Sequence, residues 1–101
     1  MKGKINIRYC TKCRWLLRSA WIAQELLTTF QEELEEVSLS PDTGGIFEIT
    51  VNGNVVWTFK EKRRFPELKE LKQIVRNIIA PEKSLGHSDA ANPPEGESCP
   101  L

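Results

Sequence analysis

The feature that most constrains this chain is a pair of cysteines set between a predicted strand and a predicted helix. Residues Lys4 to Tyr9 alternate polar and apolar side chains, the period-two pattern of a half-buried strand. Cys10-Thr11-Lys12-Cys13 follows at once, and the chain is rich in helix-forming residues from about Arg14 to Glu33. A strand that passes through Cys-x-x-Cys into a helix indicates an α/β fold with both thiols at one edge of a sheet.

Apolar residues recur along this first helix at spacings of four and three. The main stripe is Leu16, Ala20, Ala23, Leu27 and Phe30, and it is widened by Leu17, Ile22 and Leu26. We expect this face to lie on the sheet. Trp15 and Trp21 fall outside the stripe, so at least one of them should be partly exposed near the cysteines, where it is either an aromatic platform for a partner or part of the core.

Three further strands are predicted before the second helix. Leu34 to Leu39 is the first of them, and the turn formers of Ser40 to Gly45 lead into the alternating run Ile46 to Val51. Asn52-Gly53 then separates this run from Asn54 to Phe59. Asn-Gly between two β-rich runs is a strong hairpin signal, so the last two strands should pair antiparallel.

The C-terminal part of the chain contains a charge run, a helix and a tail. Lys60 to Arg64 is expected to be a solvated loop, and Phe65-Pro66 should open a helix that ends near Ala80. From residue 82 the chain loses its periodicity, so we predict a folded domain at residues 1–81 and a disordered tail at residues 82–101.

The predicted element order is β-α-β-β-β-α, a four-stranded mixed sheet with two helices packed on one face. Crossover connections between parallel strands are right-handed in nearly all proteins, which brings the second strand beside the first. The turn at Pro41 to Gly45 and the segment Lys60 to Phe65 then lie at the same sheet edge as the cysteines. We therefore expect three loops to converge on one site.

Charge and composition limit the partners and the compartment. Fourteen basic residues balance fourteen acidic ones, so no net positive field draws the chain to nucleic acid or to a membrane. No apolar run is long enough to cross a bilayer, and Met1 to Lys4 leads into the first strand without a signal-peptide core. Three cysteines are too few, and odd in number, for a secreted disulfide scaffold. We expect a cytoplasmic protein with working thiols.

The position of Cys10 and Cys13 favours redox chemistry. Backbone N–H groups at the start of a helix stabilise a thiolate, and Lys12 and Arg14 add positive charge, with Thr11 completing the motif. Two intervening residues bring the sulfurs within bonding reach in the first helical turn. A mixed disulfide on one cysteine can then be resolved by the other.

Two other interpretations of the cysteines remain open. A zinc site needs four ligands, and the only further candidates are His87 and Cys99 in the predicted tail. Simple burial of two core thiols conflicts with the polar Thr11 and Lys12 between them. We therefore predict no metal.

Together these segments resemble the Rdx family of small thioredoxin-like proteins, which includes bacterial homologues of selenoprotein W. The matching segments cover about residues 4 to 80, and they are Tyr9 to Cys13, Trp15 to Leu26, Pro41 to Ile49, and Arg64 to Pro66. The resemblance implies a thioredoxin-like fold, thiol redox activity and, in several members, a link to glutathione. Selenocysteine occupies the place of Cys13 in the selenium-containing relatives, which implies that Cys13 reacts first. Thioredoxin-like geometry instead makes Cys10 the more exposed nucleophile, and the sequence does not decide between them.

Substrate-binding residues are expected in the two other loops. Pro41 is either a cis proline against the cysteines or an ordinary turn proline, and Gly44 and Gly45 either admit a thiol ligand or only shape the turn. The cations Lys62, Arg63 and Arg64 either receive carboxylates of glutathione or of an acidic partner, or form a solvated loop. Trp57 is expected in the core.

The sequence thus predicts a thiol-disulfide redox protein of cell redox homeostasis. We expect no bound cofactor, glutathione as a co-substrate, and a thiol or disulfide substrate that includes proteins. The alternative is a redox-sensitive protein-interaction module without turnover.

Overall fold

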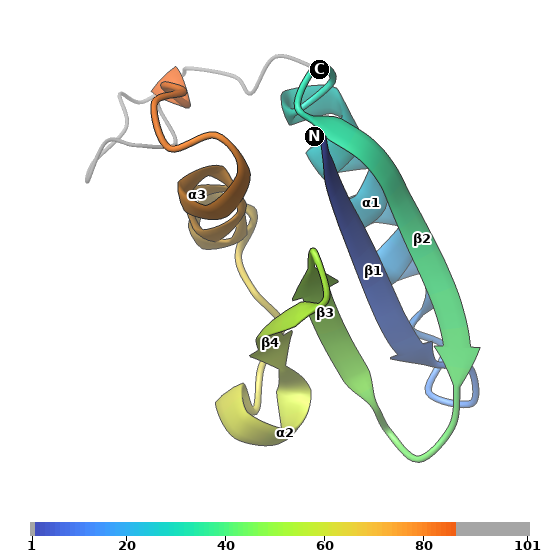
Figure 1. The fold of residues 1–101 in the computed structure, drawn as a ribbon. Coiled ribbons are helices and arrows are strands. Elements are labelled where there is room, and N and C mark those ends of the chain that lie inside the picture. The colour runs from blue at the N-terminus through green and yellow to red at the C-terminus, as the bar shows by residue number, and fades with distance from the viewer. Residues whose placement is uncertain (1, 87–101) are drawn as a thin grey trace, which may run out of the picture.

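Four strands form one mixed sheet of order β2-β1-β3-β4 in the computed structural model, which describes residues 2–86 (Figure 1). The central β1 (Gly3–Cys10) pairs parallel with β2 (Leu34–Asp42) and antiparallel with β3 (Phe47–Val51). β4 (Asn54–Thr58) pairs antiparallel with β3 at the other edge. The expected α/β class with a mixed four-stranded sheet is confirmed.

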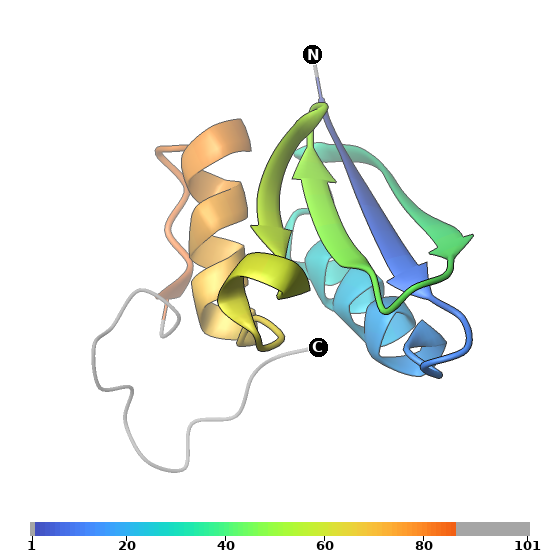
Figure 2. The ribbon, with the colours of Figure 1, turned by 90° about the horizontal axis from the view of Figure 1, so that it is seen from below.

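Two long helices cover the same face of this sheet. α1 (Leu16–Thr29) connects β1 to β2, and α3 (Leu68–Ile79) follows the short α2 (Phe59–Lys62) after β4 (Figure 2). The apolar side of β1 and the inner faces of both helices form one core, which includes Ile5, Ile7, Tyr9, Ile22, Leu26, Leu71 and Val75. The opposite face is polar along β1 and β2, where the Asn6 side chain donates hydrogen bonds to the hydroxyls of Ser38 and Ser40.

The predicted hairpin at Asn52-Gly53 is confirmed. Both residues have positive φ, 52° and 85°, which two-residue type I′ turns require and which asparagine and glycine tolerate. The Asn52 side chain also accepts a hydrogen bond from the Lys4 backbone at 2.9 Å, which ties the turn to the start of β1.

The first helix differs from its prediction in both length and orientation. It begins at Leu16 rather than near Arg14, whose φ of 61° interrupts the helical path, and it ends at Thr29. The face on the sheet contains Ser19, Ile22, Ala23 and Leu26, so the expected burial of Leu16, Leu17 and Leu27 is wrong. The apolar pattern misled because the small polar Ser19, at 0% exposure, occupies a core position.

The second strand extends past its predicted end. Pro41 and Asp42 belong to β2, because they pair with Tyr9 and Cys10 of β1. Proline is tolerated there because β2 is an edge strand, where a missing N–H breaks no ladder. No peptide bond among residues 2–86 is cis, so the cis alternative for Pro41 is wrong.

The charge run after β4 is a helix rather than a loop. Thr58 caps α2 by accepting a hydrogen bond from the Glu61 backbone at 3.2 Å, and the Glu61 carboxylate accepts one from the Thr58 hydroxyl at 3.1 Å. Thr-x-x-Glu is a recognised helix-start pattern. Arg63 ends the turn in the left-handed conformation, with φ of 60°.

The last helix and the residues after it complete the core. α3 begins after Pro66 with a Glu67–Glu70 capping box and ends before Pro81, close to the prediction. Trp57 is buried as expected, and Leu85 packs against the core. His87, Cys99 and most of the predicted tail lie outside the described residues.

Candidate active site

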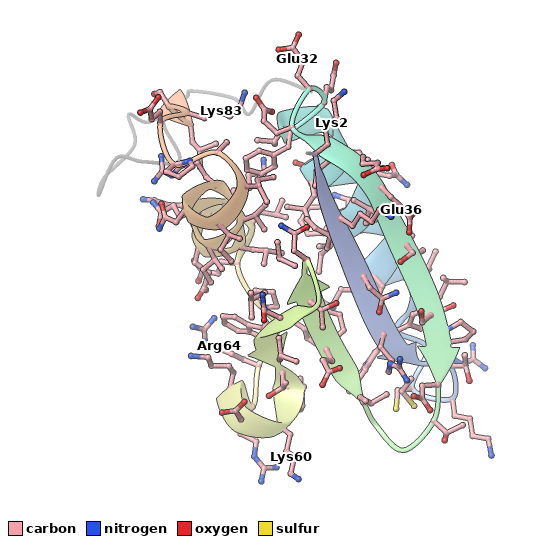
Figure 3. The ribbon with its side chains drawn as sticks, viewed as in Figure 1. Lys2, Glu32, Glu36, Lys60, Arg64 and Lys83 are labelled. Atoms are coloured by element: carbon pink, nitrogen blue, oxygen red, sulfur yellow. The ribbon has the colours of Figure 1, made fainter. Side chains whose placement is uncertain are left out.

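Both cysteines lie where β1 leaves the sheet. Cys10 is the last residue of β1, and Cys13 lies in the turn that precedes α1 (Figure 3, sulfurs in yellow). Thr11 fastens this turn to the end of β2, because its backbone N–H and its hydroxyl both donate to the Asp42 carbonyl, at 3.0 and 3.3 Å. The sequence suggested that both thiols lie in the first turn of a helix, but Cys10 lies at the end of β1 and Cys13 in the tight turn that follows it.

The two sulfurs are close together but unequally exposed. Both thiols are free, and the Cys13 thiol donates a hydrogen bond to the Cys10 sulfur at 2.6 Å. A disulfide of about 2.05 Å therefore needs only a small further approach. Cys10 is 1% exposed whereas Cys13 is exposed, so the expectation that Cys10 is the more accessible thiol is wrong. The reason is that Cys10 pairs within the sheet while Cys13 lies on the outside of the turn.

The surroundings of the pair separate the pKa values of the two thiols. The pKa of Cys10 lies below its ordinary value, first because the Cys13 thiol donates to it and further because backbone N–H groups of Gly45, Cys13 and Lys12 face its sulfur. The pKa of Cys13 is raised, first by its bond to Cys10 and then by partial burial. The pair therefore loses one proton readily and holds the second strongly.

The residues expected to support the cysteine pair, Lys12 and Arg14, contribute mainly their backbone N–H groups. Lys12 contributes its N–H toward Cys10, and the Arg14 N–H donates to the Thr11 carbonyl at 3.0 Å, which closes the turn. Gly45 has φ of 73°, a conformation that favours glycine, and this orients its N–H toward Cys10. The lowered pKa of Cys10 thus comes from hydrogen bonds rather than from the charges of Lys12 and Arg14.

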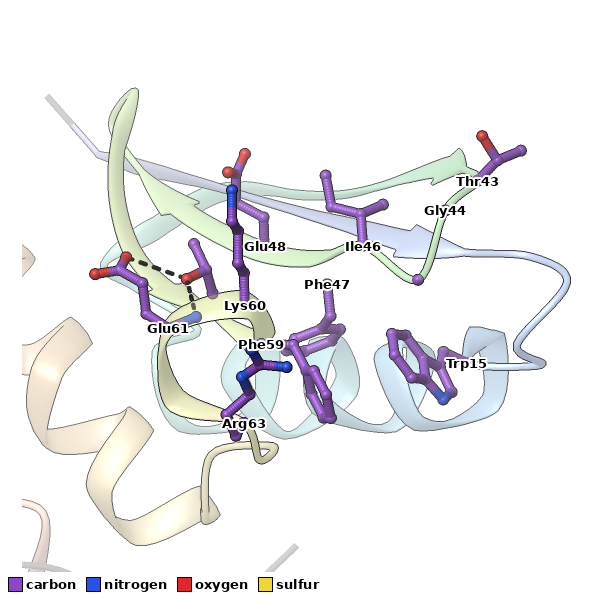
Figure 4. Close-up of a pocket in the computed structure, with 12 residues that line it drawn as sticks. Trp15, Thr43, Gly44, Ile46, Phe47, Glu48, Phe59, Lys60, Glu61 and Arg63 are labelled. Atoms are coloured by element: carbon purple, nitrogen blue, oxygen red, sulfur yellow. Dashed lines mark hydrogen bonds between the residues drawn. The ribbon is translucent and has the colours of Figure 1, made fainter.

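A groove of about 970 Å³ lies beside the cysteine turn, between the β2–β3 connection and α2 (Figure 4). Gly44 and Gly45 form one wall, and the rings of Trp15, Phe47 and Phe59 line the interior. Because Gly45 also faces Cys10, this groove adjoins the thiol pair.

The structure divides the predicted cations into two groups. Arg63 lines the groove together with Lys60, and neither forms an ion pair within residues 2–86. Arg64 instead bonds Glu70 at 2.7 Å and lies over the Trp57 ring, as does Lys62. Glu48 and Glu61 also line the groove, so its rim carries both signs of charge. Of the proposed substrate-binding residues, Gly44, Gly45 and Arg63 share the groove, whereas Pro41 and Arg64 lie outside it.

An aromatic cluster holds the cysteine turn in place. Trp15, two residues after Cys13, lies 5.0 to 5.2 Å from the rings of Phe65 and Phe59, and Phe47 lies 4.8 Å from Phe65. Sequence reasoning placed Trp15 near the motif but missed Phe47 and Phe59 as groove residues. The Thr-x-x-Glu signal at residues 58–61 predicts the turn that places Phe59, Lys60 and Arg63.

Neither a metal cluster nor a spanning helix is found among the described residues. No three His, Cys, Asp or Glu side chains gather within residues 2–86. Over the same range, no helix has the length and apolar character needed to cross a membrane.

The family to which this chain is similar is matched over a region that contains the cysteine pair. The chain matches the Rdx family over residues 4–77, which includes both cysteines and α2. The chain belongs to the Rdx family. No curated protein sequence matches it.

Two solved structures of this Rdx protein's relatives share its fold and much of its sequence. A selenoprotein W-related protein from Vibrio cholerae is 57% identical, covers 78% of this chain and 99% of its own, and superposes with a TM-score of 0.77. A Bordetella parapertussis protein is 52% identical, covers 77% of this chain and 99% of its own, and has a TM-score of 0.75.

Proposed function

We propose that this Rdx protein exchanges thiols and disulfides through Cys10 and Cys13 in a reducing compartment, the cytoplasm. The observation that carries the proposal is the pair of free thiols 2.6 Å apart, of which one is exposed. Family membership supports it, because the matched region contains both residues.

Cys13 makes the first attack, because a substrate can reach it. When the pair holds one proton, that proton rests mainly on Cys13, because the pKa of Cys10 is the lower of the two. The attack therefore uses the smaller fraction of molecules in which the proton has moved to the neighbouring Cys10 sulfur and Cys13 is the thiolate. This thiolate attacks one sulfur of the substrate disulfide, the substrate S–S bond breaks, and the other half leaves as a thiolate. A mixed disulfide on Cys13 results.

Cys10 completes the reaction as the resolving thiol. Once it has lost its proton, it attacks the Cys13 sulfur, and the remaining substrate half leaves as a second thiolate. The substrate gains two electrons, and the protein is left with a Cys10–Cys13 disulfide. Low exposure suits Cys10 to this role, because a resolving thiol needs contact only with its partner.

Glutathione is the proposed reductant that returns the protein to the dithiol state. One glutathione thiolate attacks the Cys13 sulfur of the protein disulfide, and Cys10 leaves as a thiolate. A second glutathione thiolate attacks the glutathione sulfur of the mixed disulfide, so that Cys13 leaves as a thiolate and oxidised glutathione is released. The adjoining groove supports this choice, because Lys60 and Arg63 supply cations for carboxylates beside an interior of aromatic rings. This regeneration would serve cell redox homeostasis.

The test is single-turnover reduction of hydroxyethyl disulfide by the reduced protein. We expect the parent to release two thiols per chain and a Cys10→Ser, Cys13→Ser double variant to release almost none. Cys99 remains in both proteins, so it serves as an internal control for an unspecific thiol. Equal reduction by the parent and the double variant would overturn the proposal. Negligible turnover with redox-dependent partner capture would instead support the interaction-module alternative.

A further inference from the structure

The orientation of α1 leaves apolar side chains exposed beside the reactive turn. Leu17 is 83% exposed and Trp21 is 50% exposed, and they lie one helical turn apart. With Arg14, Arg18 and two neighbouring rings they line a hollow of about 550 Å³. We define the α1 surface as Arg14, Leu17, Arg18 and Trp21.

Exposed apolar groups that gather at one place mark interaction sites more often than scattered ones do. The position of this surface is informative, because Arg14, one of its four residues, directly follows the exposed Cys13 in the chain. Arg18 is also held in place, since its guanidinium lies 4.4 Å from the centre of the Phe65 ring. The surface is thus joined to the framework that positions the thiol pair.

The charge of the α1 surface has one sign. Residues 10–24 contain three cations, Lys12, Arg14 and Arg18, and no carboxylate. The chain as a whole is neutral, so this segregation is local. Nearby carboxylates are already paired, because Asp42 bonds Arg8 at 3.2 Å and the buried Glu25 bonds Lys72 at 3.3 Å.

We propose that the α1 surface binds a protein segment that carries apolar and acidic side chains on both sides of an oxidised cysteine. The inference rests on the proposed function, because bound in this way the segment presents its disulfide to Cys13. Leu17 and Trp21 receive the apolar side chains, and Arg14 and Arg18 receive the carboxylates. A membrane is the weaker candidate, because a few apolar side chains on a neutral protein give only marginal lipid binding.

The binding test uses a synthetic peptide with leucine and glutamate on both sides of a serine that replaces the cysteine, so that affinity does not depend on reaction. Calorimetry should show binding to the parent and roughly tenfold weaker binding to Leu17→Glu. The matched control is Leu27→Glu, an exposed leucine on the same helix outside the α1 surface, whose affinity should stay within about twofold of the parent. A peptide with lysine in place of glutamate should bind at least about tenfold more weakly to the parent.

The reaction test uses the disulfide-linked dimer of the cysteine form of this peptide. Leu17→Glu should reduce it about tenfold more slowly than the parent does, yet reduce hydroxyethyl disulfide at the parental rate. Equal peptide affinity in the parent and Leu17→Glu, or equal affinity for the lysine peptide, would overturn the docking proposal. The docking proposal would also be overturned if the parent did not bind the peptide but bound phosphatidylcholine–phosphatidylserine vesicles through Leu17. If the parent bound the peptide but did not reduce hydroxyethyl disulfide, only the proposed function would be rejected, because peptide binding is measured separately.

Discussion

Two cysteines three residues apart have unlike surroundings, and this difference shapes the chemistry. Cys10 ends a strand and faces backbone N–H groups, whereas Cys13 lies on the outside of the turn and donates to Cys10. Exposure and ionisation are therefore divided between the two residues. One thiol is accessible to substrate, and the other stabilises negative charge.

This division predicts two separated ionisations in the parent. Because the pKa of Cys10 is lowered and that of Cys13 is raised, the first thiolate forms below the ordinary thiol pKa and the second above it. The thiolate fraction, and with it the alkylation rate, should fall as the pH drops through the lower of the two pKa values. In Cys10→Ser the single thiol of the pair should titrate between the two parental steps, because its bond to a sulfur is lost.

The measurement is thiolate absorbance against pH in a Cys99→Ser background. A parent that ionises both thiols in one step at the ordinary pKa would contradict this assignment.

The sequence predicted the identity of this pair but not its geometry. The strand-to-helix position of Cys-x-x-Cys is visible in the residue pattern. The left-handed φ of Arg14, which delays the helix to Leu16 and turns Cys13 outward, has no comparable signal, because glycine and asparagine are the usual residues there.

At the scale of elements, the short helix α2 shows how a local cap can build part of a site. The hydrogen bonds between Thr58 and Glu61 cap α2, so the charge run forms a helix. In this conformation Lys60 and Arg63 line the groove, while Lys62 and Arg64 lie over the Trp57 ring. The sequence contained this signal, but the density of charge favoured a loop. A local hydrogen-bond pattern therefore outweighed composition.

Removing this cap should weaken the part of the groove that we propose binds glutathione. Thr58→Ala should lower the free energy of unfolding by about 1 kcal/mol, because the first turn of α2 loses its acceptor. Reduction of the oxidised protein by glutathione should slow more than its reduction by 2-mercaptoethanol, since only glutathione has carboxylates for Lys60 and Arg63.

Urea unfolding and the two rates provide the measurements. Thr28→Ala is the matched control, because its hydroxyl bonds only a carbonyl within α1 and is exposed; it should change stability by less than about 0.5 kcal/mol. If Thr58→Ala and Thr28→Ala lowered the free energy of unfolding equally, the Thr58 side chain would not stabilise the start of α2.

At the scale of the whole molecule, a buried ion pair joins the two helices that cover the sheet. Lys72 of α3 and Glu25 of α1 lie 3.3 Å apart, and both side chains are more than nine-tenths buried. Breaking a buried pair leaves an uncompensated charge, which costs far more than the loss of an exposed pair.

Lys72→Met should therefore lower the free energy of unfolding by about 3 kcal/mol, whereas Glu25→Leu combined with Lys72→Met should recover most of that loss. Urea unfolding measures both. Lys83→Met is the control, because its pair with Glu33 is only partly buried and should contribute about 1 kcal/mol or less. A Lys72→Met variant no less stable than Lys83→Met would show that the pair does not join the helices.

The architecture was predictable because each strand carries its own signal, such as alternation in Lys4 to Tyr9 and the Asn52-Gly53 turn. The buried face of α1 was not, because Ser19 and Glu25 are polar and lie inside while Leu17 lies outside. Burial of Glu25 depends on its ion pair with Lys72 of α3, which is distant in sequence. Local periodicity cannot supply that information.

The most direct test of the account is the mass of each single-cysteine variant after brief exposure to hydroxyethyl disulfide, in a Cys99→Ser background. Cys10→Ser should gain the hydroxyethylthio group quickly at Cys13 and keep it, because no thiol resolves it. Cys13→Ser should gain it much more slowly, since Cys10 is buried. Faster modification of Cys13→Ser than of Cys10→Ser would contradict the assignment of Cys13 as the attacking thiol.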